Sequence, residues 1–343
     1  MNIDEYLESI EDKVRRGAIE SALNAALECI EWEFRYLPEE QRNLNYSVLE
    51  DESIMALGSE DYRLIQFSTG LIDHFERARF PDIRSFVTNA PLVMGASLVL
   101  NVGVAWCLSH EFAHIYRKHD SAHNAIKAAV VSKVDVGNGF RSALSLTESS
   151  LSKAFEHDAD LCATAKIYRY IQRRCSSVVD DITIRKMALF YIYWGLRTFP
   201  QSHDSDSHPA VFERLYEVTQ KLAQLPTDQS LPYIVGQDLD LQLMRVTHLF
   251  NVAIALEKAY IDISGKPEID AYWYRWFSHI DNKQHTQRAK DWQKVSPWVQ
   301  QVSGTAADNR KDIFYYKRKS AWQMKKRKKA KRKNEKVARR KSR

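Results

Sequence analysis

The sequence predicts a mainly α-helical protein, or an α+β protein with only a small sheet. Eleven glycines and nine prolines in 343 residues are too few for a turn-rich all-β fold. Hydrophobic residues make up 44% of the chain, which is enough for a substantial core. Helical spacing of apolar residues recurs along the chain, whereas only one segment is a good strand candidate.

The composition is typical of a protein from a reducing compartment. The four cysteines are scattered and form no CxxC pair, which argues against a disulfide framework. The stretch MNIDEYLESI is charged from its fourth residue and lacks the apolar core of a signal peptide. We therefore expect a cytoplasmic location.

The N-terminal region, residues 1–90, is expected to be helical with one short strand. Apolar positions at helical spacing over 3–36 predict a long amphipathic helix that ends before Pro38. The segment YRLIQFS at 62–68 is the best strand candidate, and a helix should follow it at 71–80.

Residues 85–109 form an uncharged stretch that is long enough to cross a bilayer. Asparagines, glycines and Pro91 dilute it, and it runs directly into a histidine-rich segment. A helix that is buried on nearly all sides inside its own protein is equally apolar. We therefore favour a buried helix over a membrane segment and expect no membrane association.

The histidine-rich segment WCLSHEFAHIYRKHD contains an HExxH motif. His110 and His114 are four residues apart, so on a helix they lie on one face and can bind one Zn²⁺. Glu111 would then lie beside the position of a metal-bound water. Chance alone would place this motif in about one such chain in fifty, and a helix with two ordinary histidines is the alternative. The motif therefore needs a third ligand.

One candidate for the third ligand lies close to the motif. Asp120 follows His110 by ten residues, a separation that some zinc proteases use. Those proteases have a glycine three residues after the second histidine, where this chain has Arg117. We therefore expect the helix to continue through Arg117 and to carry Asp120 away from the metal. His119 falls one position too early for a ligand.

A better candidate lies in the segment AFEHDADLCATAKIY. Glu156 and Asp160 are four residues apart on a helix predicted at 150–173, so their carboxylates share one face. Glu156 can coordinate the metal, and Asp160 can accept a hydrogen bond from a ligating imidazole. A solvated acidic face is the alternative, but small and apolar side chains surround the two carboxylates. We expect His157 and Asp158 to point outward.

A third segment, SHPAVFERLYEV, follows a polar loop predicted at 199–210. Pro209 suits the first turn of a helix at 209–224, which places His208 at the start of that helix. Arg214 could pair with a carboxylate of the site. Taken alone, this segment could equally be an ordinary helix start.

Together, the three segments resemble the Lit phage-exclusion peptidases and, more distantly, HtpX-like and CAAX-type metalloproteases. The shared pattern is HExxH, then ExxxD, then HPxxxxR, and the resemblance covers roughly residues 105–218. The family's histidine five residues beyond the second ligand falls on His119. The HtpX-like relatives have clear membrane spans, so this chain is more similar to the Lit-type group.

The resemblance implies a gluzincin-like metalloprotease core with an HExxH helix, an ExxxD helix and flanking helices. One zinc ion per chain would be bound by His110, His114 and Glu156, with Glu111 as general base. Asp160 would support a ligating histidine. The remaining roles implied are His208 as an oxyanion donor and Arg214 as an electrostatic partner. Lit-type enzymes act in abortive phage defence by cutting elongation factor Tu, which implies that protein as the substrate by analogy only.

The remaining regions have less specific signals. We place the zinc metalloprotease core at 91–225 and a C-terminal helical region at 226–305, with helices at 181–199 and 237–260. A basic tail at 306–343 is expected to be disordered. Residues 317–343 hold 16 Lys and Arg and one Glu, while the rest of the chain has a net charge of −9.

The basic tail suggests a second class of partner. Its cations suit phosphate contacts with RNA, DNA or a ribosome, and the candidate residues are Lys325, Lys326, Arg327, Lys328 and Lys329. A solubilising tail and an anionic membrane surface are the alternatives. The alternative function for the whole chain is therefore a nucleic-acid- or ribosome-associated regulatory protein with a structural or degenerate zinc site.

Overall fold

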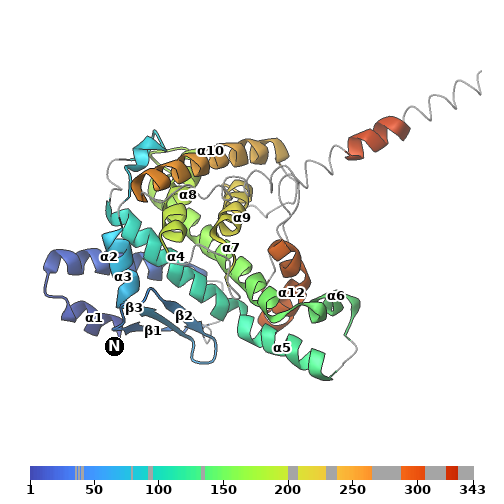
Figure 1. Cartoon of the computed structure of the whole chain (residues 1–343), viewed down its shortest axis with the longest axis horizontal. Coiled ribbons are helices and arrows are strands. Elements are labelled where there is room, and N and C mark those ends of the chain that lie inside the picture. The colour runs from blue at the N-terminus through green and yellow to red at the C-terminus, as the bar shows by residue number, and fades with distance from the viewer. Residues whose placement is uncertain are drawn as a thin grey trace, which may run out of the picture.

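A computed structural model describes residues 1–34, 37, 39, 42–78, 80–91, 96–132, 136–199, 208–228, 238–264, 287–305 and 322–330 of the chain. It confirms the mainly helical class, with helices packed around a central helix and a small sheet on one side (Figure 1). The elements are α1 Ile3–Ser9, α2 Lys13–Phe34, β1 Asn45–Leu49, β2 Ala56–Ser59, β3 Leu64–Ser68, α3 Thr69–Arg77, α4 Ala96–Arg117, α5 His119–Ser132, α6 Asn138–Arg141, α7 Glu148–Cys175, α8 Asp181–Thr198, α9 Val211–Gln224, α10 Leu239–Ser264 and α12 Gln287–Ser303, with short 3₁₀ turns η2 Ile83–Ser85 and η4 Ser142–Ser145.

The N-terminal helix predicted at 3–36 is two helices. Helix α1 begins with a capping box, in which the Asn2 and Glu5 side chains each accept a hydrogen bond from the other's backbone N–H. It ends at Ile10, whose backbone is extended. The Asp12 side chain then accepts hydrogen bonds from the first N–H groups of α2, which fixes a new helix start.

The sheet has three strands in the order β1-β3-β2. The predicted strand at 62–68 is the central strand β3, which pairs in parallel with β1 and antiparallel with β2. The two outer strands were not predicted. Strand β2 lies against α4 so closely that a Cβ on Gly58 would be 2.7 Å from the backbone oxygen of Glu111. Glycine is therefore required where this edge strand meets the HExxH segment.

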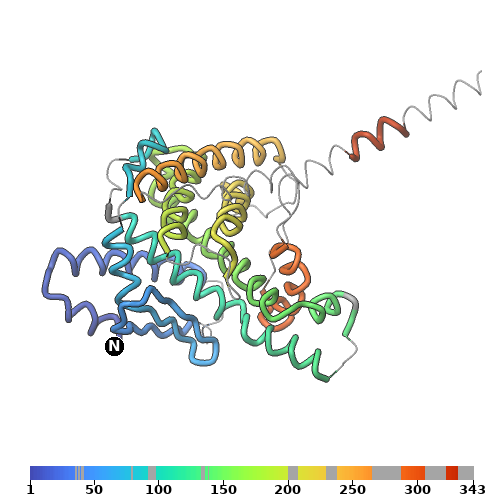
Figure 2. The backbone as a smooth tube through the Cα atoms, viewed as in Figure 1, coloured from blue at the N-terminus to red at the C-terminus, as the bar shows by residue number. Residues whose placement is uncertain are grey.

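Helix α4 runs through the middle of the molecule, between α2 and α7 (Figures 1 and 2). Within the described residues, Leu98–Arg117 is the stretch whose length and composition could cross a membrane, and 83% of it is buried inside the protein. Its apolar side chains face neighbouring helices on nearly all sides, as the sequence analysis predicted for a buried helix.

The helices predicted at 150–173, 181–199, 209–224 and 237–260 correspond to α7, α8, α9 and α10. Most of the predicted loop at 199–210 lies outside the described residues. Helices α5, α6 and α12 were not predicted. Helix α12 packs against α5 and α7 through a second apolar cluster that includes Trp292 and Trp298.

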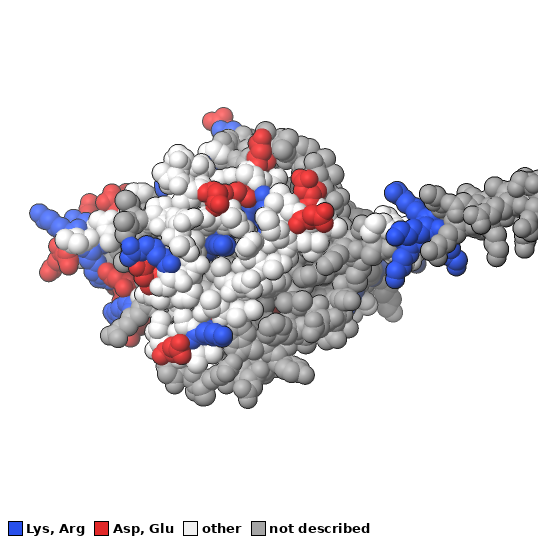
Figure 3. Space-filling model, turned by 90° about the horizontal axis from the view of Figure 1, so that it is seen from above, with Lys and Arg blue, Asp and Glu red and all other residues white. Residues whose placement is uncertain are grey.

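The described part of the basic tail, residues 322–330, is helical, and all its side chains are exposed. Its Lys and Arg side chains form a cluster set apart from the body, where both signs of charge are mixed (Figure 3). The expectation of a disordered tail did not include this helix.

Candidate metal centre

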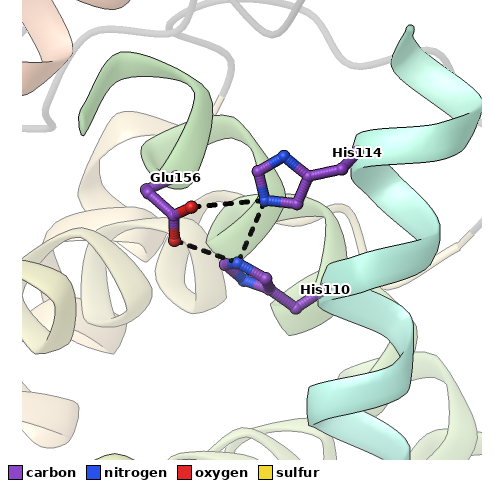
Figure 4. Close-up of side chains that lie close together, drawn as sticks. All are labelled: His110, His114 and Glu156. Carbon is purple, nitrogen blue, oxygen red and sulfur yellow. Dashed lines mark hydrogen bonds and ion pairs between the residues drawn. The ribbon is translucent and has the colours of Figure 1, made fainter. Parts of the chain in front are cut away.

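Two helices bring three ligand-type side chains together. His110 and His114 project from α4 toward Glu156 on α7 (Figure 4). The Nε2 atoms of the two histidines are 3.2 Å apart. Oε2 of Glu156 lies 3.1 Å from Nε2 of His110, and Oε1 of the same carboxylate lies 3.5 Å from Nε2 of His114. The structure thus brings together the three residues that the sequence analysis selected from segments far apart in the chain.

These separations fit a tetrahedral metal ion. For metal–ligand bonds of about 2.0–2.1 Å, neighbouring donor atoms of a tetrahedron are about 3.3 Å apart. The distance between the two Nε2 atoms, and the distance from each of them to the nearer oxygen of Glu156, are 3.1 to 3.5 Å and lie around that value. Two imidazoles and a carboxylate also form a common donor set for zinc. The cluster can therefore hold a metal ion.

Behind His110, a buried ion pair fixes the imidazole. Its Nδ1 lies 3.1 Å from Oδ1 of Asp160, on the side of the ring away from the cluster. Arg214 donates two hydrogen bonds to Asp160, at 2.9 and 2.7 Å. Burial raises the pKa of Asp160, but Arg214 and His110 outweigh it and hold the pKa far below its usual value. The ionised Asp160 favours a proton on Nδ1 of His110, which leaves Nε2 for a metal ion.

Behind His114, a second group of buried side chains orients the imidazole. Its Nδ1 lies 3.0 Å from Nδ1 of His119, and Nε2 of His119 lies 3.2 Å from Asp158. Arg117 donates to the same Asp158 carboxylate at 2.7 Å. If His119 donates its Nε2 proton to Asp158, its Nδ1 must accept from His114. The Nε2 of His114 then also keeps a lone pair directed at the cluster.

The structure corrects three expectations around this second group. Asp158 and His157 were expected to point outward, but both are buried, with exposed fractions of 0% and 3%. The helix does not continue through Arg117: α4 ends there, and Lys118 has a positive φ of 55°. This left-handed residue turns the chain so that His119, the first residue of α5, reaches back to His114. Asp120 is exposed and takes no part in the cluster.

The electrostatics of the cluster favour a positive charge. Burial lowers the pKa of His110, but Glu156 and Asp160 outweigh it and raise the pKa to about 10. Burial raises the pKa of Glu156, but His110 outweighs it and lowers the pKa to about 2. The carboxylates of Glu156, at Nε2, and of the buried Asp160, at Nδ1, therefore stabilise positive charge on His110, from either a proton or a metal ion at Nε2.

Glu111 lies beside this cluster, at the wall of a pocket of about 310 Å³. One of its carboxylate oxygens accepts a hydrogen bond of 2.8 Å from the backbone N–H of Gly58 on β2. Burial raises the pKa of Glu111 to about 7. A carboxylate with a pKa near neutrality can both accept and release a proton, which is the requirement for a general base.

His208 and Arg214 line the same pocket. The Nε2 of His208 lies 3.5 Å from Glu156, and 44% of its side chain is exposed. Burial lowers the pKa of His208. Arg214 is turned instead toward Asp160, so it acts on the cluster through that carboxylate. The structure therefore places His208 where a bound ligand could meet it and Arg214 behind the cluster.

Sequence reasoning missed the Asp158–His119–Arg117 group. His119 could have indicated this group, because it occupies the position of a histidine in the Lit-type pattern. The sequence analysis excluded His119 as a metal ligand and proposed no other role for it. Asp158 is two residues from Glu156, so on one helix it points away from Glu156. Only the turn at Lys118 brings the two segments into contact.

A partly buried glutamate beside a candidate metal cluster and a pocket has the layout of a hydrolase site. Comparison with known proteins agrees with this class: the family model for Peptidase U49 matches residues 88–235, which include all seven residues proposed for the core site. The match covers less than half of the chain and supports a proteolytic function. Comparisons with curated proteins and with solved structures gave no match.

Proposed function

We propose that the chain is a zinc-dependent endopeptidase of the gluzincin type. His110, His114 and Glu156 would hold the zinc ion, and Glu111 would be the general base. The observation that carries this proposal is the convergence of two imidazole nitrogens and the Glu156 carboxylate at 3.1 to 3.5 Å, with Glu111 next to a pocket. The Peptidase U49 match supports the choice of peptide bonds as the target.

A zinc ion held by His110, His114 and Glu156 would supply a Lewis acid that acidifies water and polarises the peptide carbonyl. Glu111 takes a proton from the attacking water and delivers it to the leaving amine. His208, the partly exposed side chain at the pocket, donates a hydrogen bond to the developing oxyanion. Asp160 and Asp158 keep the two imidazoles oriented through contacts with His110 and His119.

The edge strand β2 offers a place for an extended peptide. The N–H of Ser68 on β3 donates to the Met55 carbonyl, so the backbone groups of alternate residues, Ala56 and Gly58, face away from β3. The N–H of Gly58 indeed points at Glu111. A substrate that adds to this edge would pass directly over the general base.

The pocket favours an apolar substrate side chain. Apart from the polar residues of the site, its walls are mostly apolar and come from β2, the segment before it, α3 and α8, including Ile54, Leu57, Leu71 and Leu196. We expect cleavage next to a hydrophobic residue. A peptide series that varies only this residue would show the preference as a change in kcat/KM.

The test of the proposal compares two glutamate variants. Purified wild-type protein should contain one zinc ion per chain and cleave an unstructured protein such as casein, and a chelator should stop cleavage. Glu111→Gln should retain zinc and lose about a hundredfold to ten-thousandfold in rate. Glu148→Gln, at an exposed glutamate that begins α7, is the matched control and should cleave normally. Normal cleavage by Glu111→Gln would exclude this base, and a protein that binds no zinc would exclude the mechanism.

We propose the biological setting from the resemblance to the Lit-type peptidases. On that basis the enzyme acts in the cytoplasm as a phage-exclusion protease, and elongation factor Tu is its protein substrate. Incubation with purified elongation factor Tu, followed by electrophoresis and mass spectrometry, should yield defined fragments with the wild type and none with Glu111→Gln. Intact elongation factor Tu alongside efficient casein cleavage would exclude this substrate.

A nucleic-acid- or ribosome-associated protein with a structural metal site remains the alternative. The exposed cations of the tail helix, Lys325 to Lys329, favour RNA or DNA contacts, and Trp322 on the same helix is 61% exposed. Salt-sensitive RNA binding that disappears on deletion of residues 317–343 would assign that contact to the tail. Equal binding by the truncated protein would remove the tail from it.

A further inference from the structure

A second pocket, of about 500 Å³, adjoins the pocket that contains Glu111. Its walls come from the segment before β2, from α3 and from the end of α8. Ile54 lines both pockets, so the two are direct neighbours. We refer to the first as the Glu111 pocket and to the second as the α3 pocket, whose polar lining residues are Glu52, Thr69, Asp73, His74, Arg77 and Thr198.

Two stacked rings complete the boundary between these pockets. His74 lines the α3 pocket and Phe199 lines the Glu111 pocket, and their ring centroids are 5.6 Å apart. Burial lowers the pKa of His74, so this ring adds no positive charge near neutral pH. A ligand that crosses the boundary at Ile54 therefore passes a neutral, largely apolar surface.

The edge of β2 leads from one pocket toward the other. Ala56 and Gly58 direct their backbone groups away from β3, and Ile54 lies two residues before Ala56 on the same segment. A peptide that pairs with this edge places alternate side chains on one face, about 7 Å apart for two residues and about 13 Å apart for four. A peptide with one side chain in the Glu111 pocket can thus place a second one in the α3 pocket.

Glu52 is held in a fixed position at the α3 pocket. The carbonyl of Asp51 accepts a hydrogen bond of 2.8 Å from the N–H of Gly70, and the Ser68 hydroxyl donates to the carbonyl of Ser53. A Cβ on Gly70 would be 2.2 Å from the backbone oxygen of Glu52, so the segment lies directly on the start of α3. A carboxylate on such a fixed backbone loses little freedom when it binds a ligand.

Glu52 also carries the uncommitted charge of this pocket. Asp73 pairs with Arg15 at 2.6 Å and with Arg77 at 2.7 Å. Arg15 pairs in addition with Glu76 at 2.9 Å, so these two arginines and two carboxylates balance one another. Glu52 is exposed, and within the described part of the chain it forms no ion pair. One negative charge therefore remains for a ligand.

The other walls of the α3 pocket suit the stem of a long side chain. Ile54 and Ala78 offer apolar surface, against which the methylene groups of Lys or Arg can pack while the charged end reaches a carboxylate. The volume of about 500 Å³ falls in the range of small-ligand pockets and admits such a side chain.

We propose that the α3 pocket binds a Lys or Arg side chain of the protein substrate and that Glu52 is its counterion. The substrate segment then combines a hydrophobic residue, in the Glu111 pocket, with a cation two or four residues away on the same side of the cleaved bond. Glu52 is a specificity residue in this scheme. The assignment rests on the proposed function, because it requires a peptide along β2.

The experiment measures the binding of fluorescent peptides to full-length Glu111→Gln protein supplied with zinc. Each peptide has one Leu among Ala and Ser residues, and a single Lys is placed in turn at each position on both sides of the Leu. At one position, two or four residues from the Leu, Lys should bind about two- to fivefold more tightly than Gln. Glu52→Lys should reverse the preference, so that Glu at this position binds more tightly than Lys. Such a reversal could not come from misfolding.

Glu50→Lys is the matched control. Glu50 is exposed, forms no ion pair within the residues that the structure describes, and is not among the lining residues of the α3 pocket. This variant makes the same change of charge two residues away and should keep the preference for Lys. A reversal by Glu50→Lys as well would show a general effect of charge and would overturn the role of Glu52.

The proposal is also overturned if no peptide binds, if Lys tightens binding at no position, or if Glu52→Lys keeps the preference for Lys. Cleavage of the same peptides by the wild-type protein separates the two levels of the argument. A preference for Lys in binding without any cleavage would overturn the proposed function alone. Cleavage with equal kcat/KM for the Lys and Gln peptides would overturn the role of the α3 pocket alone.

Discussion

Replacement of Asp160 by Asn gives a sharp test of how the metal centre is supported. Asp160 is 1% exposed, contacts Nδ1 of His110 at 3.1 Å and accepts two hydrogen bonds from Arg214. The asparagine has nearly the same shape but no charge. It therefore weakens the preference for a proton on Nδ1 of His110 and leaves the buried guanidinium of Arg214 without its counterion.

Two separate losses follow from these contacts. Loss of a carboxylate behind a ligating histidine lowers metal affinity about 10-fold to 100-fold, or about 1.4–2.7 kcal/mol. Removing one partner of a buried ion pair costs about 3–5 kcal/mol of unfolding free energy. This range applies here because only 10% of the Arg214 side chain is exposed. The first loss is measured as zinc affinity against a fluorescent chelator, and the second as urea unfolding without metal.

A second buried aspartate separates the metal effect from general destabilisation. Asp291 on α12 is 4% exposed and pairs with Lys294 at 2.8 Å, outside the metal centre. Asp291→Asn should lower the unfolding free energy and leave zinc affinity unchanged. If Asp160→Asn also leaves zinc affinity unchanged, Asp160 supports only the fold, and the reasoning about His110 is wrong.

Four further predictions concern other parts of the chain. Cleavage requires ionised Glu111, whose pKa is about 7 before a metal binds and is lowered by a bound cation. The cleavage rate should therefore decrease as pH falls, with a midpoint below pH 7, and a midpoint above pH 7 would contradict this. Gly58→Ala should cost about 1–3 kcal/mol in urea unfolding and lower the cleavage rate, because the new Cβ meets the α4 backbone. Lys118→Gly should raise the unfolding free energy by up to about 1 kcal/mol, whereas Lys127→Gly, inside α5, should lower it by about 1 kcal/mol. Burial raises the pKa of Asp181, but its arginine partners outweigh burial and hold the pKa below its usual value. The ionised carboxylate therefore stabilises the fold above about pH 4, and this stabilisation is lost as pH falls. Asp181→Asn should reduce the acid sensitivity of the unfolding free energy.

The sequence was most informative where a helical repeat determines which side chains meet. The spacing of four between His110 and His114, and between Glu156 and Asp160, places each pair on one helix face. The existence of α7 and α9 followed from helical spacing of apolar residues, and the buried α4 followed from a long uncharged stretch. These features depend on local geometry, so one sequence was enough to predict them.

Features that depend on contacts between distant segments were not predicted. Strands β1 and β2 show no strand pattern of their own in sequence and become strands because they pair with β3. The Gly58 contact with Glu111 joins residues 53 positions apart. Asp158 contacts His119 because the chain turns at Lys118. Lysine rarely adopts this left-handed conformation, so the turn could not be predicted from the sequence.

The burial of α4 has a consequence for how the protein unfolds and loses activity. Its apolar stretch, Leu98–Arg117, carries both histidines of the metal centre and is also long and apolar enough to resemble a membrane span. Any partial unfolding that releases this helix exposes an aggregation-prone apolar surface and also separates His110 and His114 from Glu156. Heat inactivation should therefore lead to precipitation, and refolding should depend on dilution or on a chaperone that shields this stretch.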